Sequence, residues 1–134
     1  PGRGDVAPCK RMMSSMCPII VEGPDGRSSA LGSAGSARIK TALLQLLIHM
    51  IDGGTSPREA VRRSRLHVEG ETLYIEGWGR TRAEVDALSV LAPRTESTWG
   101  CGFFFGGAQI VEHAPTGFRT GADEDRRGCV AYVV

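Results

Sequence analysis

An apolar segment with helical spacing, at about residues 37–52, limits the possible folds more than any other part of the sequence. Its polar residues form only a thin stripe, made by Thr41, Gln45 and His49 at i, i+4 and i+8. A helix of this kind has to be buried on most of its sides, with the stripe facing a polar seam. Because the run is shorter than the roughly 20 residues that cross a bilayer, we predict no membrane-spanning segment.

Strands, turns and shorter helices are predicted around this helix. Residues 17–22 and 28–32 have the composition of strands and flank a turn that contains Pro24 and Gly26, so they predict a hairpin. The mixture of elements argues for α+β or α/β layers. The other expected elements are a short helix from Pro57 to about Arg63 with Ser56 as its N-cap, strands at 67–69 and 72–76, a helix over 81–91, an apolar sheet segment at 103–111 and a final strand at 129–134.

Composition sets the size and the broad class of the protein. The 134 residues, 41% of them hydrophobic, suit one globular domain or a domain fragment over residues 1–134. The 16 basic and 15 acidic residues are interspersed and leave a formal net charge of +1. Since no basic stripe is available for a nucleic-acid backbone, we expect no nucleic-acid partner.

The cysteine spacing predicts neither a metal site nor another cofactor site. Cys9, Cys17, Cys101 and Cys129 include no Cys-x-x-Cys pair and no zinc-finger spacing to histidine. Thiols are the default state, although four cysteines allow three disulfide connectivities. The chain begins at Pro1 and shows neither an initiating methionine nor a signal peptide, so we expect a fragment or a processed chain and leave the compartment open.

Five short segments, in one order along the chain, resemble motifs of the γ-glutamyltranspeptidase family. They cover nearly the whole sequence, so together they are specific although each alone is weak. The segments are K-R and S-S-M at residues 10–11 and 14–16, G-S-A-G-S-A-R-I at 32–39, S-R-L-H at 64–67, G-G-A-Q at 106–109 and G-A-D-E-D-R-R-G at 121–128.

This resemblance implies an α+β fold that is part of a four-layer αββα sandwich of the N-terminal-nucleophile hydrolase class. It implies an enzyme whose precursor cuts itself and frees a threonine, which attacks γ-glutamyl amides such as glutathione and forms a γ-glutamyl acyl-enzyme. The glutamyl group then passes to water, an amino acid or a dipeptide. The implied partners are a γ-glutamyl small-molecule substrate, the remainder of the small subunit and a large subunit, with no cofactor.

By the same resemblance, Ser14 and Ser15 bind the donor substrate. Each hydroxyl can donate one hydrogen bond to the α-carboxylate of the glutamyl group. The alternative is that the two serines only cap or bend the chain before a strand.

The resemblance assigns the backbone N–H groups of Gly35 and Ser36 to an oxyanion hole. They lie just before a predicted helix, where unpaired N–H groups and the helix dipole favour negative charge. The family has a second glycine where this chain has Ser36, and a positive φ there costs a serine about 1 kcal/mol. The alternative makes Ser36 an ordinary N-cap.

The remaining polar motifs predict structural roles. Arg65 and His67 are interpreted as structural, and residues 124–127 as a local ion-pair network. The family's threonine nucleophile lies upstream of the Ser-Ser-Met motif and has no counterpart here, so we expect the isolated chain to be inactive. A non-catalytic glutamyl-binding or scaffold module remains the alternative. Adhesion through Arg3-Gly4-Asp5 rests on a tripeptide that is common by chance.

Overall fold

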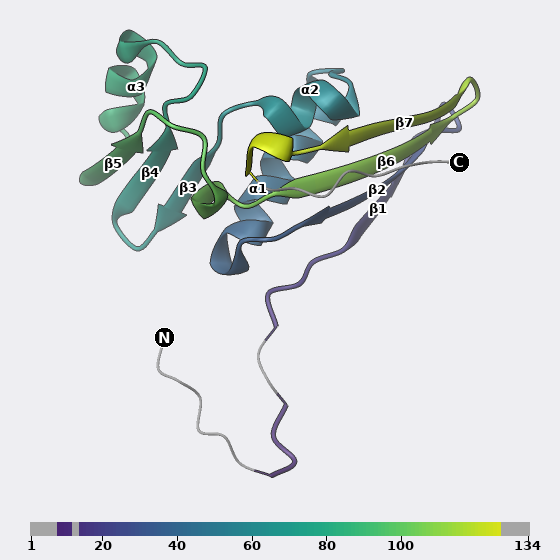
Figure 1. Ribbon diagram of the computed structural model, residues 1–134, viewed down its shortest axis with the longest axis horizontal. Coiled ribbons are helices and arrows are strands. Elements are labelled where there is room, and N and C mark those ends of the chain that lie inside the picture. The colour runs from purple at the N-terminus through teal and green to yellow at the C-terminus, as the bar shows by residue number, and fades with distance from the viewer. Residues whose placement is uncertain (1–7, 12–13, 127–134) are drawn as a thin grey trace.

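The computed structural model describes residues 8–11 and 14–126, which fold into two sheets with helices packed on them (Figure 1). The larger sheet is antiparallel and has the order β1-β2-β6-β7, while the smaller sheet has the order β3-β4-β5. The fold is therefore α+β. The strands are β1 Ile19–Glu22, β2 Ser28–Ser33, β3 Leu66–Glu69, β4 Thr72–Glu76, β5 Arg94–Thr98, β6 Ala108–Ala114 and β7 Gly117–Ala122.

The predicted long helix is confirmed, but it consists of three consecutive helical types. A 3-10 turn η1 (Ser36–Arg38) leads into the α-helix α1 (Ile39–Leu47), which continues as a π-helical turn η2 (Ile48–Asp52). The wide turn is visible in the hydrogen bond from the Gly53 N–H to the Ile48 carbonyl, at 3.0 Å. Among the described residues, no helix is long and apolar enough to span a membrane.

Two shorter helices begin after capping residues, of which Ser56 was predicted. α2 (Pro57–Arg62) starts after Ser56, and α3 (Arg82–Ser89) starts after Thr81. In both, the cap side chain accepts a hydrogen bond from the N–H three residues on, and the glutamate at that position binds back to the cap N–H. These reciprocal bonds satisfy N–H groups that have no partner inside the helix.

The main core lies between the larger sheet and the helices α1 and α2. Strand register places Leu31 opposite Ile110, and both side chains are buried under Leu43 and Leu46 of α1. α2 approaches β7 so closely that a Cβ atom at Gly121 would lie 2.3 Å from the Pro57 carbonyl oxygen. Only glycine fits there, so the position of α2 on the sheet depends on this residue.

Two residues of the predicted polar stripe, Thr41 and Gln45, face β3. Thr41 Oγ1 lies 2.9 Å from His67 Nδ1. The Gln45 amide donates to the Leu66 carbonyl and accepts from the Leu66 N–H, at 2.8 and 2.9 Å. A second, smaller core under α3 joins Leu73, Ile75 and Val85 in the other sheet.

The sequence-based prediction is wrong for part of the C-terminal half. Phe103–Phe105 form a 3-10 turn (η3) instead of a strand, and β6 begins only at Ala108. β5 and β7 were not predicted, because neither alternates apolar with polar residues in the way that a half-buried strand does. The expected strand at 129–134 and the tripeptide at 3–5 lie outside the described residues.

One face of the larger sheet is not covered by any described helix. The register places Ile20, Ala30, Val111 and Thr120 in one row across it, with Phe118 in the next row. Ile20 is 77% exposed and Phe118 is 58% exposed. An apolar sheet face of this kind requires a covering layer.

We expect the isolated chain to self-associate through this open face. A double substitution, Ile20→Ser with Phe118→Ser, should shift the sedimentation-velocity distribution toward monomer, since it removes the apolar area that drives association. Val90→Ser is the matched control, because Val90 is 82% exposed on the other sheet's side of the molecule at the end of α3. A monodisperse monomer for the unmodified chain would contradict this prediction.

Candidate functional site

The turn between β2 and η1 presents two backbone N–H groups with no partner among residues 8–11 and 14–126. Gly35 has a φ of +125° and Ser36 a φ of +55°. Among the described residues, neither N–H donates a hydrogen bond, whereas the neighbouring Ala34 and Arg38 N–H groups both do. The two N–H groups lie at the start of the helical run, where the dipole is positive. This geometry can accept an anion.

Ser36 does not act as a helix N-cap. The residue before η1 is Gly35, the residue before α1 is Arg38, and neither start has a side-chain cap. The positive φ of Ser36 therefore has no compensating cap bond and is strained for a residue with a Cβ atom. Its conformation is the left-handed one that glycine adopts at no steric cost.

The turn at Gly106 and Gly107 packs directly against the Gly35–Ser36 turn. A Cβ atom at Gly35 would lie 2.9 Å from the Cα of Gly106, and a Cβ atom at Gly106 would lie 2.2 Å from the Ala34 carbonyl oxygen. The Ala34 N–H also donates to the Gly107 carbonyl, at 2.9 Å. The two backbones are thus in direct contact, and the shape of the Gly35–Ser36 turn depends on where residues 106–107 lie.

Arg65 holds this supporting segment in place. Its guanidinium donates to the Phe105 carbonyl at 3.2 Å and to the Gly106 carbonyl, and it forms an ion pair with Asp123 at 2.6 Å. Only 2% of Arg65 is exposed. The structural role predicted for Arg65 is therefore supported by its contacts, and that role reaches the turn that carries the two free N–H groups.

Arg65 belongs to a buried network of two arginines and two acids. Arg126, in the 3-10 turn η4 (Glu124–Arg126), contacts Asp123 at 2.8 Å and the Glu76 carboxylate at 2.7 Å. Glu76 Oε2 also accepts a hydrogen bond from the backbone N–H of Arg65, at 2.9 Å. The prediction of an ion-pair network within residues 124–127 is wrong for its described members, since Arg126 is fully buried and pairs with Asp123 and with Glu76, which is 50 residues away.

The charges of this network balance, and each is compensated by contacts. Burial lowers the pKa of Arg65, although Asp123 opposes this effect. For Arg126, burial also acts to lower the pKa, but the hydrogen bonds and charge of Glu76 outweigh it and raise the pKa. Both guanidinium groups stay protonated at neutral pH. Breaking one pair would leave a buried charge without a partner.

Ser14 and Ser15 lie in an extended segment that leaves the body of the fold before β1 (Figure 1). Both residues are exposed. The Ser14 hydroxyl accepts a hydrogen bond from the Met16 N–H at 3.2 Å, so its proton remains available for donation. Within the described residues, no hydrogen bond joins either serine to Gly35 or Ser36, so the structure does not bring the two predicted pairs together.

The described residues contain no convincing nucleophile. Thr41 lies beside His67, but its hydroxyl proton is donated to the Arg38 carbonyl at 3.1 Å, which leaves the Thr41 oxygen to accept a hydrogen bond from His67 Nδ1–H and gives His67 no proton to remove. Burial raises the pKa of the Cys101 thiol to about 11, which leaves little thiolate at neutral pH. In the part of the chain that the structure describes, no three His, Cys, Asp or Glu residues gather as a metal site would require.

Comparisons with known proteins agree on one family. The family model for γ-glutamyltranspeptidase matches residues 4–133. The acylase ACY 1 proenzyme of Pseudomonas sp. (strain SE83) is 32% identical over 123 residues, which are 91% of this chain and 21% of that protein. The glutathione hydrolase proenzyme of Pseudomonas sp. (strain A14) is 33% identical over 112 residues, 81% of this chain and 17% of its own length. The chain thus spans about a fifth of these relatives.

A solved structure gives the same result for the fold. The γ-glutamyltranspeptidase from Pseudomonas nitroreducens complexed with L-DON superimposes with a TM-score of 0.76 and 27% identity, covering 96% of this chain and 67% of that one. The α+β arrangement is therefore part of an αββα N-terminal-nucleophile hydrolase sandwich.

Glu76→Gln should lower the free energy of unfolding by about 3–5 kcal/mol, because Arg126 would lose its buried counter-charge. Glu69→Gln, the same change at an exposed position of β3, should alter it by less than about 0.5 kcal/mol. Urea unfolding followed by circular dichroism measures both. A loss below about 1 kcal/mol for Glu76→Gln would contradict the role given to the network, and failure of that variant alone to fold would agree with it.

Substitutions in the Gly35–Ser36 turn should have opposite effects on stability. Ser36→Gly should stabilise the fold by about 0.5–1 kcal/mol, since it removes the strain of the positive φ but adds freedom to the unfolded chain. Gly35→Ala should destabilise it by roughly 2–4 kcal/mol through φ strain and contact with Gly106. Thermal unfolding tests both changes, with Ser36→Ala expected to be near neutral. A destabilised Ser36→Gly variant would show that the turn is not strained.

Proposed function

Because this chain belongs to the γ-glutamyltranspeptidase family, we propose that it is part of a γ-glutamyltransferase or hydrolase and supplies its oxyanion-hole segment and its donor-carboxylate segment. The reaction is cleavage of γ-glutamyl amides such as glutathione through a γ-glutamyl acyl-enzyme. One observation carries the proposal: the Gly35 and Ser36 N–H groups, at the start of a helix, donate to no group in the part of the chain that the structure describes.

Those two N–H groups are suited to the charge that develops in acyl transfer. When a nucleophile attacks the γ-carbonyl, its oxygen becomes an oxyanion, and donors fixed beforehand lower the barrier. Loss of one such donor costs roughly 100- to 1,000-fold in kcat in other acyl-transfer enzymes. Here the contact of Gly35 with Gly106, together with the anchoring of Gly106 by Arg65, supports a fixed position for the donors.

The exposed serines supply the second part of the proposal. Ser14 and Ser15 donate their hydroxyl protons to the α-carboxylate of the glutamyl donor. Their segment is extended, and it approaches Gly35–Ser36 when the glutamyl group binds between them. The remainder of the small subunit and a large subunit cover the open face at Ile20 and Phe118 and supply the nucleophile.

The alternative is a non-catalytic glutamyl-binding or scaffold module. The encoded sequence upstream of Pro1 discriminates between the two, since a cleavage-site threonine there belongs to an enzyme. Both relatives compared above are named as enzymes, which supports the enzymatic proposal.

Titration of the chain with L-glutamate should shift the backbone amide resonances of Ser14, Ser15, Gly35 and Ser36 in a saturable way. The probe 4-aminobutyrate lacks the α-carboxylate and should leave the two serines unchanged. The double variant Ser14→Ala with Ser15→Ala should lose the glutamate response, while Ser97→Ala on β5 should keep it. Absence of shifts in a well-folded chain would overturn the binding roles and favour the scaffold alternative.

The same preparation should not hydrolyse a chromogenic γ-glutamyl anilide, because we assign the nucleophile to another part of the enzyme. Steady turnover that copurifies with the chain, and that disappears in a variant such as Thr41→Val, would contradict this assignment.

A further inference from the structure

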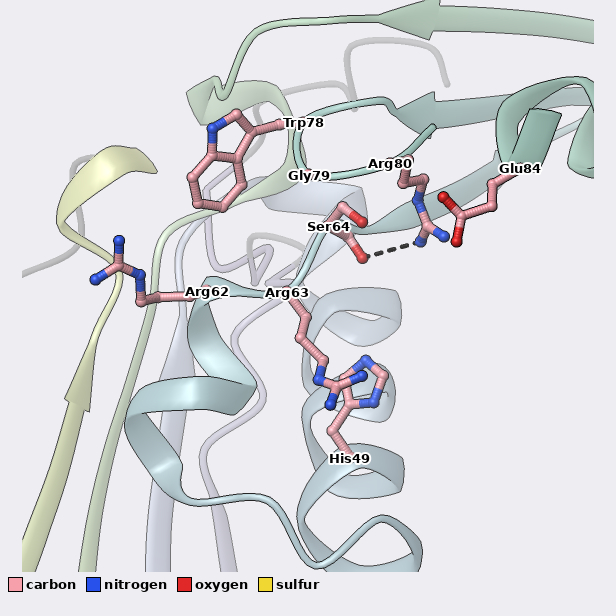
Figure 2. A pocket seen from close by; sticks show the side chains of 8 residues that line it. All are labelled: His49, Arg62, Arg63, Ser64, Trp78, Gly79, Arg80 and Glu84. Carbon is pink, nitrogen blue, oxygen red and sulfur yellow. Dashed lines mark hydrogen bonds between the residues drawn. The ribbon is translucent and has the colours of Figure 1, made fainter. Parts of the chain in front are cut away.

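A hollow of about 410 Å³ lies between the end of α2, the π-helical turn η2 and the loop before α3 (Figure 2). Arg63, Arg80, His49 and Trp78 line it. Its volume falls in the range of sites that bind small molecules. None of these residues belongs to the segments assigned to glutamyl binding, so the two proposals can fail separately.

The hollow carries an excess of positive charge. Arg63 and Arg80 contribute two positive charges, and Glu84 contributes one negative charge, which leaves one positive charge with His49 neutral. Arg62 points away from the other side chains (Figure 2). The Glu84 carboxylate is already bound to the Thr81 N–H at 2.6 Å and to the Thr81 hydroxyl at 2.8 Å, where it caps α3.

Arg80 is held in place by backbone carbonyl groups, and although the Glu84 carboxylate lies beside it (Figure 2), no ion pair joins the two among the described residues. Its Nε donates to the Glu76 carbonyl and its Nη2 to the Ser64 carbonyl, both at 3.2 Å. Carbonyl oxygens carry only partial charge, so the guanidinium keeps its attraction for an anion. The Ser64 contact is drawn in Figure 2.

Arg63 and His49 are the other two polar side chains that face the anion site. The Arg63 guanidinium lies beside the His49 ring (Figure 2), and no carboxylate among the described residues forms an ion pair with it. Burial, followed by the charges of Arg63 and Arg80, lowers the pKa of His49. The His49 backbone is fixed in turn, since its carbonyl accepts from the Thr55 N–H at 3.0 Å and the Thr55 hydroxyl at 2.8 Å.

We propose that this hollow binds a small phosphate ester, with the phosphate between Arg63, Arg80 and His49 and the organic group against Trp78. A phosphate presents three acceptor oxygens, which suits the N–H donors of two guanidinium groups and of the His49 ring. Donors from three different segments suit a tetrahedral anion, whereas a flat carboxylate needs only one guanidinium fork. The Trp78 ring offers an apolar surface to the rest of the ligand.

Isothermal titration calorimetry with inorganic phosphate, at an ionic strength held constant with sodium chloride, tests the anion site. We expect saturable binding to the unmodified chain and a dissociation constant about tenfold higher for Arg63→Gln, the low end for losing a charge-assisted hydrogen bond. Arg27→Gln removes the same charge from the turn between β1 and β2 and should bind like the unmodified chain. The proposal would be overturned if phosphate injections gave the same heats as sodium chloride injections, or if Arg63→Gln bound phosphate as tightly as the unmodified chain does.

Phenyl phosphate tests the role of Trp78. It should bind at least roughly threefold more tightly than inorganic phosphate, through contact with the indole ring. Trp78→Leu should remove this advantage and leave the affinity for inorganic phosphate within twofold. Equal affinities of the two probes for the unmodified chain would overturn the assignment of the organic group to Trp78.

Discussion

The buried network of Arg65, Glu76, Asp123 and Arg126 is the interaction on which the rest of the structure depends. The network joins five parts of the chain at one point. They are the end of α2, the residue before β3, the end of β4, the segment before β6 and the segment after β7. The two carboxylates neutralise the two guanidinium groups, and backbone carbonyls accept most of the remaining N–H groups, while Arg65 Nε has no partner among the described residues. A network with no exposed member fixes its geometry tightly, because any displacement leaves a charge without a partner.

The candidate site depends on this network indirectly, through the backbone at Phe105 and Gly106. Arg65 orients the carbonyl groups at Phe105 and Gly106, and Gly106 lies against Gly35. The anion binding that we propose for the turn therefore depends on backbone groups, and the side chains act by fixing where the backbone runs. Membership of the γ-glutamyltranspeptidase family fits this arrangement, since acyl transfer needs donors that are in place before the reaction begins.

Local features of the fold could be predicted from the sequence, and long-range ones could not. The hairpin at β1 and β2 and the cap at Ser56 depend on neighbouring residues, and both were predicted. β5 has the sequence Arg-Thr-Glu-Ser-Thr and is held in the sheet by backbone pairing with β4, so no apolar pattern marks it. The pair between Glu76 and Arg126 joins positions that only the fold brings together. The Gly35–Ser36 turn was found through a motif, and the contact with Gly106 had no sequence signal.

The Gln45 side-chain amide limits where a further strand can pair with the smaller sheet. By donating to the carbonyl and accepting from the N–H of Leu66, the side chain imitates the backbone of a neighbouring strand. The outer edge of β3 is thereby occupied by its own helix at that position, and an incoming chain would have to displace Gln45 to pair there. The rim that remains open for strand addition in the smaller sheet is β5. A helix side chain thus gives the sheet a direction of extension that its strand order alone does not specify.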